Sequence, residues 1–185
     1  MGLFGKPYGE KYHTRAIEVN TYEYDEGRLA VEGCLKDHRF QAYHLETGEK
    51  RPPGIMHQMA IHLLVNKVTL VIEDLKVEMP VVPDGHCSEV LKFMEPVKGL
   101  RIAGGFTSKI KELVGGSKGC THIIELLAEM SFSTIQGLIA YKQQGPLMSK
   151  SELIHIVENT CWAWRSEGPM IKWMKDQIEA EKKIL

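Results

Sequence analysis

The sequence lacks several features that would point directly to a class of function. Its four cysteines include no Cys-x-x-Cys pair, and no run of about 18 apolar residues is present. The charges nearly cancel, because 23 Lys and Arg stand against 24 Asp and Glu, for a net charge of -1. A chain this close to neutral has no overall attraction for nucleic acid or for anionic membranes. We therefore expect neither nucleic acid nor a membrane among its partners.

Well-known catalytic and targeting motifs are also missing. The first residues lack the apolar core of a signal peptide, which predicts a cytoplasmic protein whose cysteines are reduced. The patterns of serine-nucleophile elbows, zinc-protease helices, EF-hand loops and dinucleotide-binding loops are absent. A phosphate-binding P-loop is excluded because its lysine follows the last glycine, whereas Lys118 precedes Gly119 and Cys120 follows it.

The apolar pattern that is present predicts an α+β fold. The chain has 185 residues, of which 43% are hydrophobic and 25% charged, as expected for one globular domain spanning residues 1–185. Strands that precede helices favour an antiparallel sheet, built from the N-terminal half, with helices packed on one face. Period-two alternation predicts strands at 13–24, 29–37, 57–65 and 68–77, with a loop at 40–56. Helices are expected at 88–94, 107–114, 122–143 and, as a peripheral element, about 170–185.

The segment from Gly115 to His122 is the most informative local pattern. It contains three glycines and places Cys120 and His122 at the start of the longest predicted helix. Free N–H groups and the helix dipole at such a position stabilise a thiolate. A Cys-x-His pair can bind a metal ion, or it can act as a nucleophile with its base. The same residues also fit a glycine-rich turn with a capping cysteine and a solvated histidine.

Other candidate ligands are scattered along the chain. Cys87 lies in a loop, Cys161 follows Asn159, and His57 begins a predicted strand. Each of these side chains also fits simple packing. His62 should point to the opposite face of the strand from His57, so the two are not expected to share a metal ion.

A basic stretch is a candidate anion-binding element. Residues 98–118 carry five basic side chains against one acid. Within and beside this stretch, Arg101, Lys118 and Gly119 are the residues that we assign to anion binding. A solvated basic surface is the alternative.

With these residues in view, the chain resembles a bacterial family of proteins of unknown function, DUF2889. The resemblance spans most of the chain and is strongest at the Gly-Cys-Thr-His piece, Gly119 to His122. The other matching pieces include 13–15, 25–27, 35–37, 54–59, 72–74, 99–102 and 161–163. The family implies no known reaction. The order of three dispersed cysteines is also similar to that of iron–sulfur scaffold proteins, although the residues around them differ.

Two hypotheses about function follow. In the first, metal ligands converge on one site that binds zinc, iron or an iron–sulfur cluster, or that carries out thiol chemistry; the ligands are Cys87, Cys120, His122, Cys161 and His57. In the second, the protein is a non-catalytic module for ligand binding or assembly, and its cysteines are structural. The expected partner is a small molecule or a metal. Enzymatic activity and a homo-oligomeric state are left open.

Overall fold

The computed structural model describes residues 5–145 and 148–182 and has an α+β architecture. The chain forms two compact units, residues 1–137 and 138–185, with the boundary inside helix α2. The first unit contains a four-stranded antiparallel sheet with the strand order β1-β2-β5-β6. Its strands are β1 (His13–Glu23), β2 (Arg28–Arg39), β5 (Gly54–Asn66) and β6 (Ile72–Val81). The predicted fold class is confirmed.

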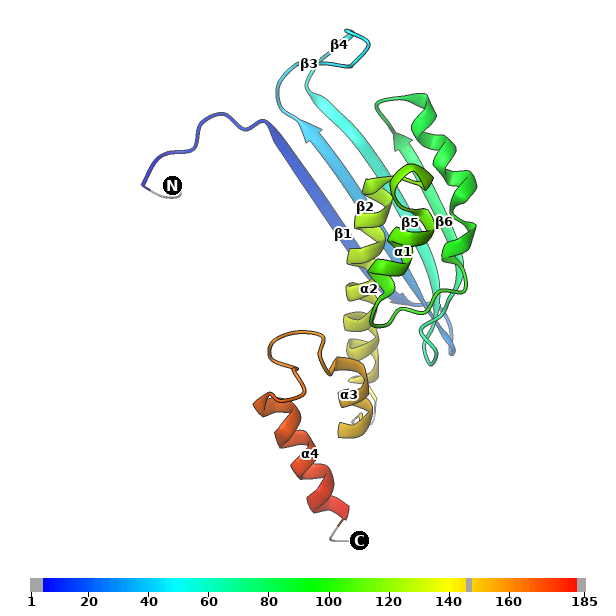
Figure 1. Cartoon of the computed structure of the whole chain (residues 1–185), viewed down its shortest axis with the longest axis vertical. Helices are drawn as coiled ribbons and strands as arrows, with labels where there is room; N and C mark the ends of the chain where they lie inside the picture. The colour runs from blue at the N-terminus through cyan, green and yellow to red at the C-terminus, as the bar shows by residue number, and fades with distance from the viewer. Residues whose placement is uncertain (1–4, 146–147, 183–185) are drawn as a thin grey trace. The chain divides into compact units, whose positions relative to one another are not determined.

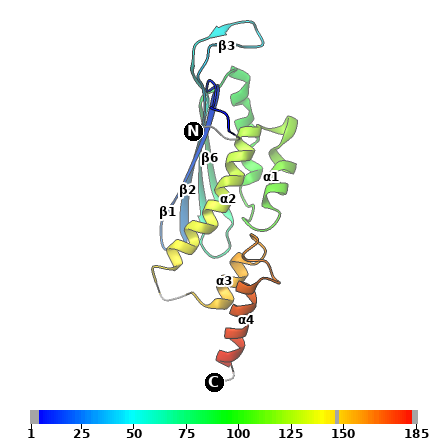
Figure 2. The ribbon, with the colours of Figure 1, turned by 90° about the vertical axis from the view of Figure 1, so that its left-hand side faces the viewer.

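Helices cover one face of this sheet, as Figures 1 and 2 show. After β6 the chain forms two 3-10 helices, η1 (Gly85–Phe93) and η2 (Glu95–Val97). Helix α1 (Phe106–Val114) and the short η3 (Gly116–Lys118) then lead into α2 (Thr121–Lys142). The long helix predicted at 122–143 is therefore present, displaced by one residue at each end.

The core lies between the sheet and these helices. Alternation on β2 and β5 buries one face of each strand, including Leu35 on β2 and Ile61 on β5, while Glu32 and Lys36 face away from the core. Helix α2 approaches the sheet closely at Gly33, where a Cβ atom would lie 2.6 Å from the sulfur of Met130. By length and composition, α2 is the one helix in the described ranges that could cross a membrane; core helices share these properties, and its side chains Ile123, Leu126, Leu127 and Met130 are buried.

The predicted boundaries differ most from the structure at β6 and in the segment before β5. The strand expected at 68–77 runs from Ile72 to Val81, because the Asn66 side chain accepts hydrogen bonds from the N–H groups of Val68 and Thr69 and holds a turn. Pro80 lies inside this strand rather than ending it, which an edge strand tolerates. The expected loop at 40–56 contains the small hairpin β3 (Tyr43–His44) and β4 (Lys50–Arg51) and the first residues of β5.

The second unit contains two helices, α3 (Lys150–Val157) and α4 (Pro169–Lys182). Helix α3 begins with a capping box in which Ser149 and Glu152 satisfy each other's backbone N–H groups. Val157 of α3 and Ile171 and Met174 of α4 form a small buried cluster. The C-terminal helix that the sequence predicts therefore packs against α3 in this unit.

Candidate metal centre

The inward face of the sheet changes from apolar to charged at one end. In the strand register, Arg15 of β1 lies opposite Asp37 of β2, and Asp37 lies opposite His57 of β5. Strand alternation places Asp37 on the same face as the buried Leu35, and His57 on the same face as the buried Met59. A β-bulge between Asp37 and His38 interrupts the pairing at this point. Bulges often occur next to functional sites, where they redirect a side chain.

Asp37 is the centre of a dense polar network. Its side chain is 4% exposed, and Arg15 donates two hydrogen bonds to it, from Nε to Oδ1 at 2.8 Å and from Nη2 to Oδ2 at 2.7 Å. His13 Nε2 lies 3.2 Å from Oδ1. The hydrogen bonds from Arg15 outweigh burial and lower the pKa of Asp37 from 3.8 to about 2. The carboxylate is therefore ionised at neutral pH.

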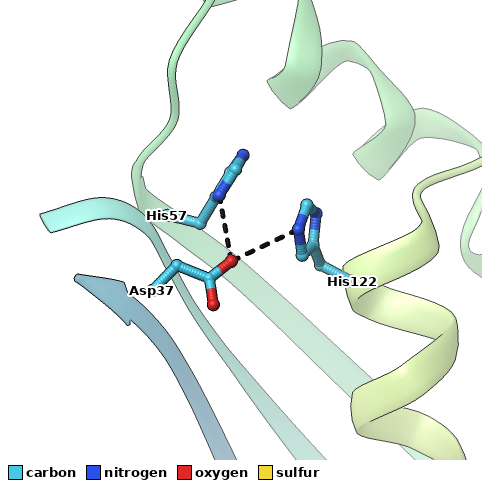
Figure 3. A group of neighbouring side chains, drawn as sticks. All are labelled: Asp37, His57 and His122. Carbon is cyan, nitrogen blue, oxygen red and sulfur yellow. Dashed lines mark hydrogen bonds and ion pairs between the residues drawn. The ribbon is translucent and has the colours of Figure 1, made fainter. Parts of the chain in front are cut away.

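Two imidazoles face the inner oxygen of this carboxylate (Figure 3). His57 Nδ1 lies 3.1 Å from Asp37 Oδ2, and His122 Nε2 lies 3.4 Å from the same oxygen. The two rings stand 4.1 Å apart between centroids, and the three potential ligand atoms lie within 4.8 Å of one another. Burial is the main cause that lowers the pKa of both His57 and His122 below 6.5. Neutral imidazole, the form that binds metals, is thus favoured near pH 7.

The first turn of α2 brings His122 to this group. Gly119 passes so close to α1 that a Cβ atom would lie 1.8 Å from the carbonyl oxygen of Val114. Cys120 precedes the helix, and its carbonyl accepts the hydrogen bond of Ile124 N. Cys120 Sγ lies 3.6 Å from His122 Nδ1, the ring nitrogen that faces away from Asp37. One turn later, Glu125 forms an ion pair with Arg15, so the helix is tied to β1 as well.

These groups have two chemical capacities. Two ligand atoms bound to a tetrahedral ion at about 2.0–2.1 Å are about 3.3–3.4 Å apart, and adjacent atoms around an octahedral ion are about 2.9–3.0 Å apart. The separations of 3.1 Å and 3.4 Å from Asp37 Oδ2 to the two ring nitrogens lie near these values, and the three atoms together lie within 4.8 Å of one another. The sequence of contacts from Cys120 through His122 to Asp37 also resembles a thiol nucleophile with its base and an orienting carboxylate.

Some of the metal ligands predicted from the sequence lie together at this centre. His57 and His122 come together, and Cys120 contacts His122. Cys87 is half-buried in η1 and Cys161 is exposed in the second unit. Among the described residues, the group with metal-ligand spacing consists of Asp37, His57 and His122, without a cysteine.

The residues predicted to bind an anion have structural contacts of their own. Lys118 Nζ donates to the carbonyl oxygen of Glu112 near the end of α1, at 3.0 Å. Gly119 packs against the last turn of that helix. Arg101 forms a backbone bridge with Val71. Anion binding by these residues stays a prediction.

Asp37, Arg15 and His13 are site residues that the sequence pattern did not suggest. Asp37 could have been recognised as a site residue from the sequence, because it continues the inward-facing alternation of Leu29, Val31 and Leu35. A charged residue on the inward face of a strand is seldom fully buried unless it is paired with an opposite charge. Arg15 and His13 lie on the equivalent face of β1, beyond its apolar residues.

Acid should destabilise the protein through Asp37. Because the pKa of Asp37 is about 2 when folded and 3.8 when unfolded, its contribution of about 2 kcal/mol is present above pH 4 and is lost as the pH falls towards 2. Denaturant titrations of the wild type and of Asp37→Asn at several pH values in this window measure the difference. The wild type should lose about 2 kcal/mol more than the variant. Equal losses would show that the Arg15 pair does not stabilise the fold.

Comparison with known protein families matches the part of the chain that carries this site. Neither the curated proteins nor the solved structures include a match to the chain. The model of the family described as "Protein of unknown function (DUF2889)" matches residues 13–136. That range begins at His13 and includes Asp37, His57, His122 and Glu125. The chain therefore belongs to the DUF2889 family.

Proposed function

We propose that this protein binds one divalent transition-metal ion through Asp37 Oδ2, His57 Nδ1 and His122 Nε2. The observation that carries the proposal is the convergence of both imidazoles on one carboxylate oxygen, at 3.1 Å and 3.4 Å. Zinc and ferrous iron are the ions that two histidines and one carboxylate most often hold with open coordination positions. A nitrogen and oxygen ligand set favours such a mononuclear ion over an iron–sulfur cluster, which cysteine thiolates hold.

The contacts around Asp37 leave its Oδ2 able to bind a cation. Each carboxylate oxygen has two lone pairs, so Asp37 Oδ2 can accept from Arg15 Nη2 and still face the two imidazoles. Arg15 and His13 hold the other oxygen, Oδ1, and thereby orient the carboxylate. Asp37 and Glu125 supply negative charge at the site, and Arg15 and Arg39 supply positive charge near His57.

The proposed activity is Lewis-acid catalysis on a small molecule in the cytoplasm. Side-chain exposures of 15% for His57 and 22% for His122 leave both imidazoles partly accessible to solvent. A three-ligand site supplies positions at which a bound ion polarises a substrate oxygen or activates water. A thiol nucleophile based on Cys120 explains the contact with His122, but it leaves His57 without a role.

Metal titration tests the proposal. Protein stripped with a chelator should bind one equivalent of Co²⁺, with the visible absorption of a low-symmetry site, and Zn²⁺ should displace it. His57→Ala and His122→Ala should each weaken binding at least about 100-fold, because each removes a direct ligand.

His62→Ala is the matched control. His62 lies on the same strand as His57 but on the opposite face, where it pairs with Glu32 at 3.4 Å. This variant should bind Co²⁺ like the wild type. If the wild type binds no metal under these conditions, the metal proposal fails, and the non-catalytic module becomes the better description.

A further inference from the structure

The contact between Cys120 and His122 indicates a role for this cysteine that differs from metal ligation. Sγ lies 3.6 Å from His122 Nδ1, whereas Asp37 Oδ2 lies 3.4 Å from Nε2 of the same ring. The two nitrogens point in different directions from the imidazole. An ion held at Nε2 is therefore on the far side of the ring from the sulfur.

A histidine that binds metal through one nitrogen carries its proton on the other. That second N–H almost always donates a hydrogen bond, which fixes the tautomer and the plane of the ring. In most metal sites the acceptor is a carboxylate, a backbone carbonyl or water. For His122, the interaction found at Nδ1 is with the sulfur of Cys120.

We propose that Cys120 is a positioning residue of the metal centre: its sulfur accepts the Nδ1–H of His122 and so directs Nε2 towards the ion beside Asp37. This inference rests on the proposed metal site. The sulfur needs only a lone pair for this role, and a neutral thiol supplies one.

The local backbone supports this arrangement. Cys120 and His122 are two positions apart across the start of α2, and the Cys120 carbonyl already accepts from Ile124 N. Gly119 packs against the Val114 carbonyl and thereby holds the preceding peptide. The sulfur and the imidazole are therefore both placed by the same helix start, and the ring has little freedom to turn while Sγ stays in contact.

Two variants separate hydrogen bonding from packing. Cys120→Ala removes the acceptor and should weaken Co²⁺ binding about 10–100-fold, the range for lost partners of metal-bound histidines. Cys120→Ser keeps an acceptor, and serine is also a good residue at a helix start, so its binding should lie close to that of the wild type. Cys34→Ala is the matched control, because Cys34 is a half-buried free cysteine on the other face of the sheet.

A double-mutant cycle distinguishes action through His122 from a general structural effect. In a His122→Ala background, Cys120→Ala should cause no further loss of Co²⁺ affinity, since the ring that the sulfur positions is absent. Zn²⁺-loaded wild type should also show a slowly exchanging imidazole N–H resonance for His122 in NMR spectra, present in Cys120→Ser and lost in Cys120→Ala.

The results of these experiments distinguish failure of the positioning role from failure of the metal site. If wild-type protein binds Co²⁺ and Cys120→Ala binds it equally well, the positioning role is overturned while the metal site stands. Additive losses in the cycle, or failure of Cys120→Ser to retain affinity while it folds normally by circular dichroism, would also overturn it. If the wild type binds no metal, the failure belongs to the proposed function itself.

Discussion

Replacement of Asp37 by asparagine is expected to abolish high-affinity metal binding and to lower the free energy of unfolding by about 3 kcal/mol. The substitution removes the charge of a carboxylate that is 4% exposed and that accepts two hydrogen bonds from Arg15. Removing one partner of such a pair leaves the other charge without compensation. Co²⁺ titration and denaturant unfolding of the same preparations measure the two effects.

Asp74→Asn provides the comparison for this variant. Asp74 also pairs with a basic residue, Lys98 at 2.9 Å, but its side chain is 65% exposed. Solvent screens such pairs, so this change should leave both the unfolding free energy and the metal affinity nearly unaltered. An Asp37→Asn variant that bound Co²⁺ as tightly as the wild type would remove Asp37 from the ligand set.

Gly119→Ala should disturb the proposed metal site, although Gly119 is not one of its ligands. A Cβ atom at this position would lie 1.8 Å from the carbonyl oxygen of Val114, a backbone atom that cannot turn aside. The chain must therefore shift at the residue directly before Cys120. We expect a loss of about 2–3 kcal/mol in stability from this overpacking. Metal affinity should fall at least about tenfold, because His122 moves relative to Asp37 and His57.

Gly104→Ala is the control for the effect of adding a methyl group. A Cβ atom at Gly104 meets no atom within 4 Å, and this glycine has no left-handed backbone conformation. The variant should fold and bind metal like the wild type. Equal behaviour of the two glycine variants would show that the turn into α2 is not what places His122.

The sequence alone was sufficient to predict the class of fold and the helix start that carries Cys120 and His122. Alternation on β2 and β5 predicted their strands, because side chains on a strand point alternately to its two faces. The glycine-rich turn before Cys120 and the apolar spacing after it predicted the start of α2 within one residue. Both signals are local, so they can be recognised without knowing what packs against them.

The boundaries that differed depend on side-chain hydrogen bonds and on a strand's place in the sheet. The turn after Asn66 is held by that residue's own side chain, and Pro80 is accommodated because β6 is an edge strand. The sequence does not show which strand becomes an edge.

Only the tertiary structure decided which residues share the site. Asp37 meets Arg15 and His57 through the register of three strands, and a slip of one residue would turn Asp37 to the other face of the sheet. His122 joins them because α2 packs across that face. The sequence suggested that Cys87, Cys120, His122, Cys161 and His57 share a site, and side-chain packing brings together a carboxylate, two imidazoles and the sulfur of Cys120. Ligand sets of this kind are assembled by contacts between segments far apart in the chain, and no local pattern encodes those distances.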